Sequence, residues 1–168
     1  MSPVSGHTTD AISFAASDRV QVFADYYSAG SKAKPLILLF HQAGSNRGEY
    51  ATIGPRLAAL GFNALAIDQR SGGNAWGRTN ETVKHLGKST DYDEALLDLE
   101  AALQWAKSSG HTGPILVWGS SYSALWCFCS PPSIVVKSEL FSHSHRANIC
   151  AAQRPSGKQR RRSRSRYS

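Results

Sequence analysis

Three short, continuously apolar runs constrain the fold of this chain more than any other feature of its sequence. They are Leu36–Phe40 (LILLF), Ala64–Ile67 (ALAI) and Ile115–Trp118 (ILVW). Each has the length of a strand, and none alternates apolar with polar residues, as a strand with one wet face would. We therefore expect all three to be covered on both faces, as in a parallel sheet. Helical patterns separate them, and the alternation of strand and helix predicts an open α/β sheet with right-handed crossovers.

Two segments between these runs have helical periodicity. In the first, apolar residues recur at steps of three and four, at Tyr50, Ile53, Leu57 and Leu60. Asn46 and Glu49 have the spacing of a capping box, but Pro55 predicts that the regular helix starts only there. In the second, Thr90 and Asp93 are the expected capping box, and one side of the helix carries Leu96, Leu99 and Leu103.

The flanking segments complete the predicted body of the fold. Ile12–Ala16 and Val20–Tyr27 are expected to be two strands joined by a polar turn. Gly72–Lys88 has no periodicity and is expected to be a long loop at the strand ends, where loops often shape ligand sites. The predicted fold class is α/β, with about five mostly parallel strands flanked by helices, as in the N-terminal portion of a larger sheet.

The composition of the chain changes abruptly after Trp126. Residues 1–126 carry ten Lys and Arg against eleven Asp and Glu, whereas residues 127–168 carry nine basic residues and one acid. All three cysteines lie in the second part, which ends in the basic run Arg160–Ser168 (RRRSRSRYS). We expect 1–126 to be a partial domain and 127–168 to be an irregular, disordered basic tail. Within that tail, Ile134–Val136 is a candidate strand of three residues.

The first 126 residues carry no signal for secretion or for insertion into a membrane. They contain no cysteine, so no disulfide framework is expected there. No basic region followed by an apolar run marks a signal peptide at the N-terminus, and no apolar stretch approaches the roughly 20 residues of a membrane span. We expect a cytoplasmic protein that does not enter a membrane.

The segment that follows the last apolar run has the pattern of a nucleophile elbow. Its sequence is Gly119-Ser120-Ser121-Tyr122-Ser123. In such an elbow a serine lies on a strained turn between strand and helix, with small residues two positions before and after it. Gly119 and Ser123 occupy those positions relative to Ser121, which makes Ser121 the candidate nucleophile. The alternative is an ordinary serine-rich loop after a strand.

A second segment supports this interpretation. Phe40-His41-Gln42-Ala43-Gly44 follows an earlier buried strand and precedes a helix. There the backbone N–H of Gln42 and that of Tyr122 could form an oxyanion hole, which stabilises a tetrahedral intermediate. We expect His41 to support the loop through hydrogen bonds and not to act as a base.

Four motifs together resemble the α/β hydrolases, and among them most closely the dienelactone-hydrolase-like esterases. The motifs are LLFHQAGSNRGEY, RLAALGFNALAIDQRSGG, DYDEALLDLEAALQWA and ILVWGSSYSA. The resemblance implies hydrolysis of a small carboxylic ester or lactone without metal or cofactor. It assigns the nucleophile to Ser121 and the oxyanion donors to Gln42 and Tyr122. It gives Asp68 a structural role, two strand spacings or roughly 10 Å from the nucleophile strand.

The chain departs from this family in the residues that should complete a catalytic triad. After Ser121 it holds one acid, Glu139, and two histidines, His143 and His145. The family places acid and histidine on loops after separate later strands, so an acid and a histidine four residues apart do not fit. The triad is therefore expected to be incomplete, with little or no turnover, and the tail to be a truncated or frame-shifted continuation of a hydrolase.

Parts of the sequence are also compatible with three other functions. The Arg- and Ser-rich tail could bind nucleic acid, although 1–126 adds no basic patch to it. A metal site would use residues whose spacing fits no common zinc motif, namely Cys127, Cys129, His143, His145 and Cys150. The third alternative is a non-catalytic interaction protein built on a partial hydrolase sheet with an open edge. The sequence predicts no oligomeric state.

Overall fold

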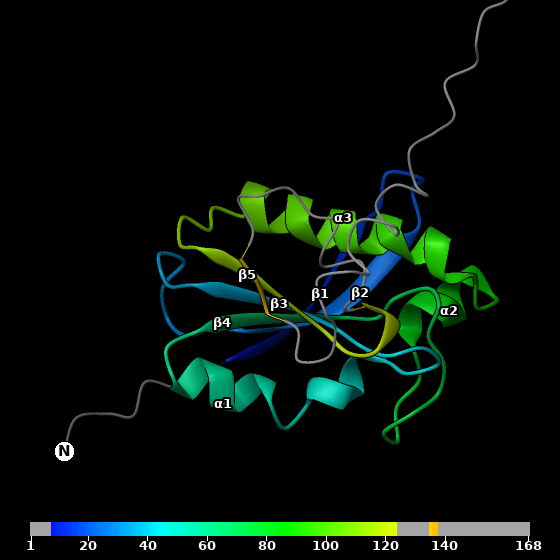
Figure 1. The fold of residues 1–168 in the computed structure, drawn as a ribbon, viewed down its shortest axis with the longest axis horizontal. Helices are drawn as coiled ribbons and strands as arrows, with labels where there is room; N and C mark the ends of the chain where they lie inside the picture. The colour runs from blue at the N-terminus through cyan, green and yellow to red at the C-terminus, as the bar shows by residue number, and fades with distance from the viewer. Residues whose placement is uncertain (1–7, 124–134, 138–168) are drawn as a thin grey trace, which may run out of the picture.

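The computed structural model of this chain describes residues 8–123 and 135–137, and these form one sheet between helices (Figure 1). The sheet has six strands in the order β1-β2-β4-β3-β5-β6. Their bounds are β1 Thr9–Ala15, β2 Gln21–Tyr27, β3 Leu36–Phe40, β4 Asn63–Ile67, β5 Ile115–Gly119 and β6 Val135–Lys137. The three apolar runs are thus the adjacent strands β4, β3 and β5, and every residue of β3 and β4 is buried, as their sequences predict. The same prediction is wrong for β5, where only Val117 is buried and Trp118 is exposed.

The pairing of the strands confirms the expected fold class. β1 pairs with β2 and β2 with β4 in antiparallel fashion, whereas β3–β4, β3–β5 and β5–β6 are parallel. The two outer strands predicted near the N-terminus are β1 and β2. The sixth strand, β6, begins one residue later than the candidate Ile134–Val136 and lies along β5.

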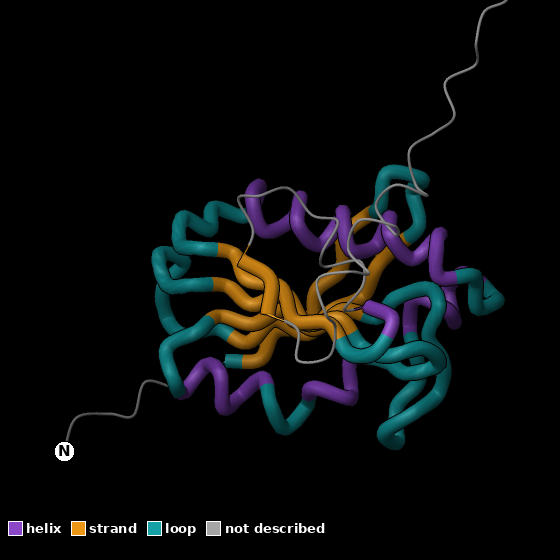
Figure 2. Tube along the Cα trace, viewed as in Figure 1, coloured by secondary structure: helices purple, strands orange, loops and turns teal. Residues whose placement is uncertain are grey.

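Helices cover both faces of this sheet (Figure 2). The 3-10 helix η1 (Arg47–Tyr50) and α1 (Gly54–Ala59) lie on one face, and α3 (Tyr92–Ser108) lies on the other. The regular helix of the first segment begins at Gly54 with proline in its first turn, as Pro55 predicts. The capping box predicted at Thr90 is wrong. The N-cap of α3 is Asp91, and the backbone N–H of Thr90 donates instead to the carbonyl of Arg70 at 2.9 Å.

The segment Gly72–Lys88 is not a loop throughout, because it contains the short helix α2 (Glu81–Leu86). A helix of six residues is too short to display a periodic apolar pattern. Its ends are nevertheless well defined. The Asn80 side chain accepts a hydrogen bond from the N–H of Val83 at 2.9 Å, and Gly87 ends the helix with a φ of +80°.

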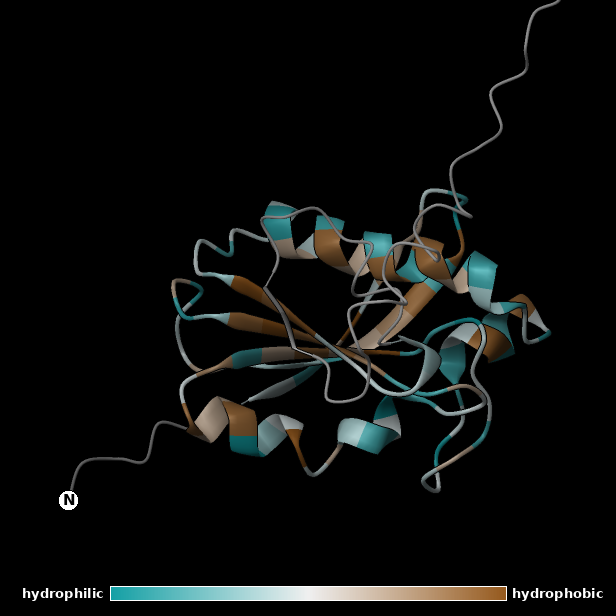
Figure 3. Ribbon diagram, in the orientation of Figure 1, coloured by the Kyte–Doolittle hydropathy of each residue, from teal (hydrophilic) through white to brown (hydrophobic). Residues whose placement is uncertain are grey.

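Two apolar cores lie on opposite faces of the sheet (Figure 3). One joins α3 to the sheet and the other joins α1 and η1 to it. The leucine side of α3 predicted from sequence faces the core, because Leu99 is buried there and the half-buried Leu96 and Leu103 pack against it. The buried residues of the helix are Ala95, Asp98, Leu99, Ala101, Ala102 and Ala106. Most of the contact face is therefore alanine, which the leucine pattern does not mark.

Within the described residues, no helix combines the length and the apolar character that crossing a membrane requires.

Candidate active site

Ser121 lies in an exposed, left-handed turn directly after β5. Its φ is +55°, and the chain becomes helical at Tyr122. Left-handed backbone in a residue other than glycine costs about 1 kcal/mol or more, and such residues concentrate at functional sites. The strand, the strained serine and the helical start thus follow one another as in the predicted elbow.

Two hydrogen bonds join this turn to the end of the neighbouring strand β3. The N–H of Ser120 donates to the carbonyl of Phe40 at 2.9 Å, and the Ser123 hydroxyl donates to the carbonyl of His41 at 2.6 Å. Gln42 is the next residue along the chain. The structure therefore brings together the segments that carry the three predicted site residues, Ser121, Gln42 and Tyr122.

His41 is wholly buried beneath this junction. Its Nε2 accepts a hydrogen bond from the N–H of Gln69 at 2.9 Å, so the ring proton is on Nδ1, which donates to the carbonyl of Gln42 at 2.7 Å. Burial lowers the pKa of His41 to about 4, so the ring is neutral at physiological pH. Both ring nitrogens are thus engaged with backbone, and His41 supports the loop, as expected.

The Gln69 side chain bonds to the two residues that follow Ser121 in the turn. Its side-chain amide donates to the Tyr122 hydroxyl at 2.9 Å and to the Ser123 hydroxyl at 3.0 Å. The Tyr122 hydroxyl also contacts the Ser71 hydroxyl, and its ring stacks on that of Tyr92 with 4.4 Å between centroids. The Ser123 side chain, in place of the usual glycine, therefore has its own partners in a buried polar network.

The backbone N–H of Gln42 already has an acceptor. It donates to Oε2 of Glu49 at 3.2 Å, and the Ser45 hydroxyl donates to the same oxygen at 2.9 Å. The indole N–H of Trp76 in turn donates to the Ser45 hydroxyl at 2.9 Å. The capping-box spacing predicts only a capping role for Glu49, and no local pattern indicates this contact to a residue seven positions earlier.

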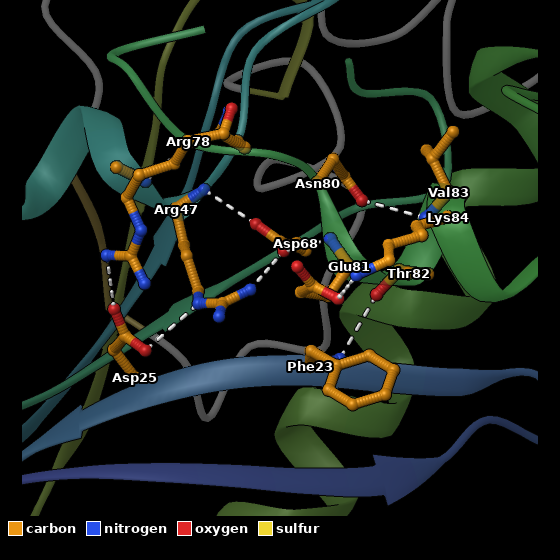
Figure 4. Close-up of polar contacts among 12 residues, drawn as sticks. Phe23, Asp25, Arg47, Asp68, Arg78, Asn80, Glu81, Thr82, Val83 and Lys84 are labelled. Carbon is orange, nitrogen blue, oxygen red and sulfur yellow. Dashed lines mark hydrogen bonds and ion pairs between the residues drawn. The ribbon is translucent and has the colours of Figure 1, made fainter. Parts of the chain in front are cut away.

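Asp68 lies outside the site, in a buried ionic network (Figure 4). Its carboxylate accepts from the N–H groups of Arg47 and Glu81, each at 2.8 Å, and pairs with the Arg47 guanidinium. Arg47 and Arg78 both pair with Asp25 at the other end of the network. Burial raises the pKa of Asp68, which Arg47 partly offsets. The order β4-β3-β5 places β4, which Asp68 follows, two strands from the nucleophile strand, as predicted.

The other two histidines of residues 8–123 lie away from the turn. His85 contacts the carbonyl of Glu81 at 3.0 Å within α2, and its ring packs on Phe23. His111 precedes β5, whereas Ser121 follows it, so the two lie at opposite ends of that strand.

The tail residues considered for a triad or a metal site lie outside the described residues. They are Cys127, Cys129, Glu139, His143, His145 and Cys150, and the basic run Arg160–Ser168 lies outside as well. Among the residues that are described, no cluster of three or more His, Cys, Asp or Glu could hold a metal ion.

Comparison with known families gives one match that covers more than half of the chain. The family model described as serine aminopeptidase, S33, matches residues 31–128. No curated protein matches the chain.

Several solved structures of α/β hydrolases are similar to the chain. An esterase from Pyrococcus furiosus is 25% identical, with a TM-score of 0.52, and the match covers 73% of this chain and 44% of the esterase. A thermostable carboxyl esterase from Bacillus coagulans is 16% identical with a TM-score of 0.59, covering 74% and 41% of the two chains. The α/β hydrolase GrgF from a Penicillium species is 14% identical with a TM-score of 0.61, covering 76% and 43%. The chain thus spans less than half the length of these three structures.

Proposed function

This chain belongs to the serine aminopeptidase S33 family of α/β hydrolases, and on that premise we propose that it carries the nucleophile portion of a serine ester hydrolase. The observation that supports this most is the turn at Ser121, an exposed serine at φ +55° between a parallel strand and the start of a helix. Within the family we place the chain in the dienelactone-hydrolase-like branch, on the order and spacing of its four motifs. The substrate class that follows is a small carboxylic ester or lactone.

In this proposal Ser121 supplies the attacking oxygen. Its oxygen adds to the carbonyl carbon as its proton passes to solvent water, and the carbonyl oxygen takes up the negative charge of the tetrahedral intermediate. The N–H groups of Gln42 and Tyr122 donate to that oxyanion, because the bonds between the turn and β3 hold both segments together. Collapse of the intermediate then breaks the ester C–O bond and leaves an acyl group on Ser121, while the leaving alkoxide takes a proton from water and departs as the alcohol.

In this proposal the catalytic triad is incomplete, because the chain has a nucleophile but no identified base or acid. None of the three histidines in residues 8–123 serves as the base, since His41 is bonded at both nitrogens and His85 and His111 lie elsewhere. Without a base, Ser121 is acylated slowly and the acyl enzyme is hydrolysed slowly. A residual rate enhancement over water still comes from the oxyanion hole and substrate binding. We therefore expect acylation by activated esters without the turnover of a working esterase.

The test is acylation of purified protein by p-nitrophenyl acetate, followed by release of p-nitrophenol and by intact mass. We expect one acetyl group per chain, added slowly, lost in Ser121→Ala and kept in the neighbouring control Ser120→Ala. Equal acetylation of the Ser121→Ala protein would refute the nucleophile assignment. Rapid turnover that depends on Ser121 would refute the incomplete triad.

We further propose that the tail after Trp126 is a frame-shifted continuation of a longer cytoplasmic hydrolase. The support is the change from a nearly neutral, cysteine-free segment to a basic, cysteine-containing one. Sequencing the coding DNA across codons 121–132 and translating all three frames tests this. We expect another frame to restore further apolar strands followed by an Asp and then a His. If no frame does so, the basic tail is native, and salt-dependent nucleic-acid binding is the next measurement.

A further inference from the structure

The backbone N–H that the proposed function assigns to the oxyanion is occupied by a carboxylate of the protein itself. Gln42 donates to Oε2 of Glu49 at 3.2 Å. Glu49 comes from η1, so the contact folds the first turn of that helix back over the loop that follows β3. A carboxylate oxygen at a backbone N–H carries the same charge, in the same kind of position, as the oxygen of a tetrahedral intermediate.

Two further hydrogen bonds hold the carboxylate in place. The Ser45 hydroxyl donates to the same Oε2 at 2.9 Å, and the Trp76 indole N–H donates to the Ser45 hydroxyl at 2.9 Å. Trp76 itself is 60% exposed and has a left-handed φ of +56°. An exposed aromatic residue in a strained turn thus forms the outer end of a chain of contacts that leads to Gln42.

The loop that carries Trp76 is itself tethered to η1. The side-chain amide of Asn46, the N-cap of η1, donates to the carbonyls of Gly73, Ala75 and Arg78 at 2.9–3.0 Å. The same side chain accepts from the N–H of Gly48 at 2.8 Å. Asn46 therefore links the loop that carries Trp76 to η1, which carries Glu49, through several hydrogen bonds.

This arrangement is incompatible with the chemistry proposed for the site. One N–H group makes one strong hydrogen bond, so Gln42 cannot serve Glu49 and a substrate oxyanion together. Two negative charges a few ångströms apart also repel each other, and because this contact is exposed, solvent screens part of that repulsion. While Glu49 occupies the N–H, the intermediate has lost one of its two proposed donors and has gained a neighbouring anion.

We propose that Glu49 is an internal inhibitor of this site, which has to leave the Gln42 N–H before an ester carbonyl is stabilised there. The inference rests on the proposed function, since it assumes that Ser121 attacks and that Gln42 donates to the oxyanion. The hydrogen bonds from Trp76 to Ser45 and from Ser45 to Glu49 keep the Glu49 carboxylate in this position. The acylation rate of the chain as it stands is thus limited by Glu49 as well as by the missing base.

The test compares pseudo-first-order rates of Ser121 acetylation by p-nitrophenyl acetate. Loss of one oxyanion donor typically lowers rates by about 100- to 1000-fold, so freeing a blocked donor should raise the rate by about 10-fold or more. We expect this rise for Glu49→Ala. Glu49→Gln should give a smaller rise, because an amide oxygen still accepts from Gln42 but carries no charge. Trp76→Phe, which removes the indole N–H together with the five-membered ring but keeps an aromatic side chain, should also raise the rate.

Glu100→Gln is the matched control, because it removes one negative charge from an exposed position on α3. Its acetylation rate should equal that of the unmodified chain. Hydrogen exchange of the Gln42 amide, followed by NMR, provides a second measurement that does not depend on acetylation of Ser121. Exchange should accelerate in Glu49→Ala, because the amide has lost its acceptor.

The outcomes separate the inference from the function on which it rests. An unchanged or lower rate in Glu49→Ala, with Ser121 still acetylated, would overturn the inhibitory role and make Glu49 a positioning residue of the loop. Unchanged exchange of the Gln42 amide would likewise show that the contact does not protect that group. Absence of Ser121 acetylation in every variant would overturn the proposed function, and the inference with it.

Discussion

The neutral, buried His41 predicts that the fold loses stability in mild acid. Burial lowers the pKa of this ring to about 4 in the folded chain, compared with an ordinary value of 6.5. The unfolded chain therefore binds a proton that the folded chain rejects. The stabilising contribution is fully present above pH 6.5 and is lost progressively as the pH falls from 6.5 toward 4.

The size of the effect follows from the two pKa values. A group with pKa 6.5 unfolded and about 4 folded lowers the free energy of unfolding by about 2 kcal/mol between pH 7 and pH 5. Burial also lowers the pKa of His111, which acts in the same direction. Burial raises the pKa of Asp68 and Asp98, and these carboxyls act in the opposite direction. The pH dependence of the free energy of unfolding is therefore a sum of these contributions. The contribution of His41 has to be separated from the others by substituting this residue.

The variant His41→Gln isolates it. A glutamine amide oxygen can accept from the Gln69 N–H in place of Nε2, and glutamine does not titrate. Urea unfolding followed by tryptophan fluorescence at pH 7 and pH 5 gives the free energy of unfolding of each protein. We expect the original chain to lose about 2 kcal/mol more than the variant between these two pH values. Equal losses in the two proteins would refute the assignment of a neutral, proton-rejecting His41.

Three further substitutions test the packing around the site. Asp98→Asn should cost about 3 kcal/mol in urea unfolding, because Asp98 is buried and accepts three hydrogen bonds from Arg70; a cost below about 1 kcal/mol would contradict this. Asn46→Ala should cost about 1–3 kcal/mol and accelerate proteolysis of the Trp76 loop, since three carbonyls lose their donor; unchanged cleavage would count against the tether. Gly54→Ala should lower the melting temperature, because its Cβ would lie 2.4 Å from the buried Tyr27 ring.

The sequence predicted those parts of the fold whose signals are local and apolar. Strands β3 and β4 were visible as apolar runs because both of their faces are covered. Strand β5 was visible as an apolar run although it is only partly buried and its Trp118 is exposed. Pro55 marked the start of α1, because a proline is tolerated in the first turn of a helix and excluded from its interior. The candidate elbow was proposed on a similarly local signal, since Ser121 closely follows an apolar strand and has small residues two positions before and after it.

The features that the sequence did not predict share a different physical cause. Most of the buried face of α3 consists of alanines and Asp98 beside Leu99, and the leucine pattern does not highlight these smaller and charged residues. Helix α2 is shorter than two turns, and its evidence is a single side-chain cap. The contact from Glu49 to Gln42 depends on how η1 folds back over the loop, which is a tertiary property. Charged and small residues take their partners from the fold, so their roles could not be predicted from spacing.

The residues of the proposed site all lie where the sheet itself places them. Ser121 and both proposed oxyanion donors lie at the ends of two adjacent strands, β3 and β5, and backbone and buried side-chain hydrogen bonds hold these segments together. None of these bonds requires an acid or a base from later loops. On the proposed function, the nucleophile and its oxyanion donors would therefore form with the sheet, and Glu49 would occupy the Gln42 N–H until a substrate binds. The proposal thus predicts slow acylation that a single substitution at Glu49 accelerates.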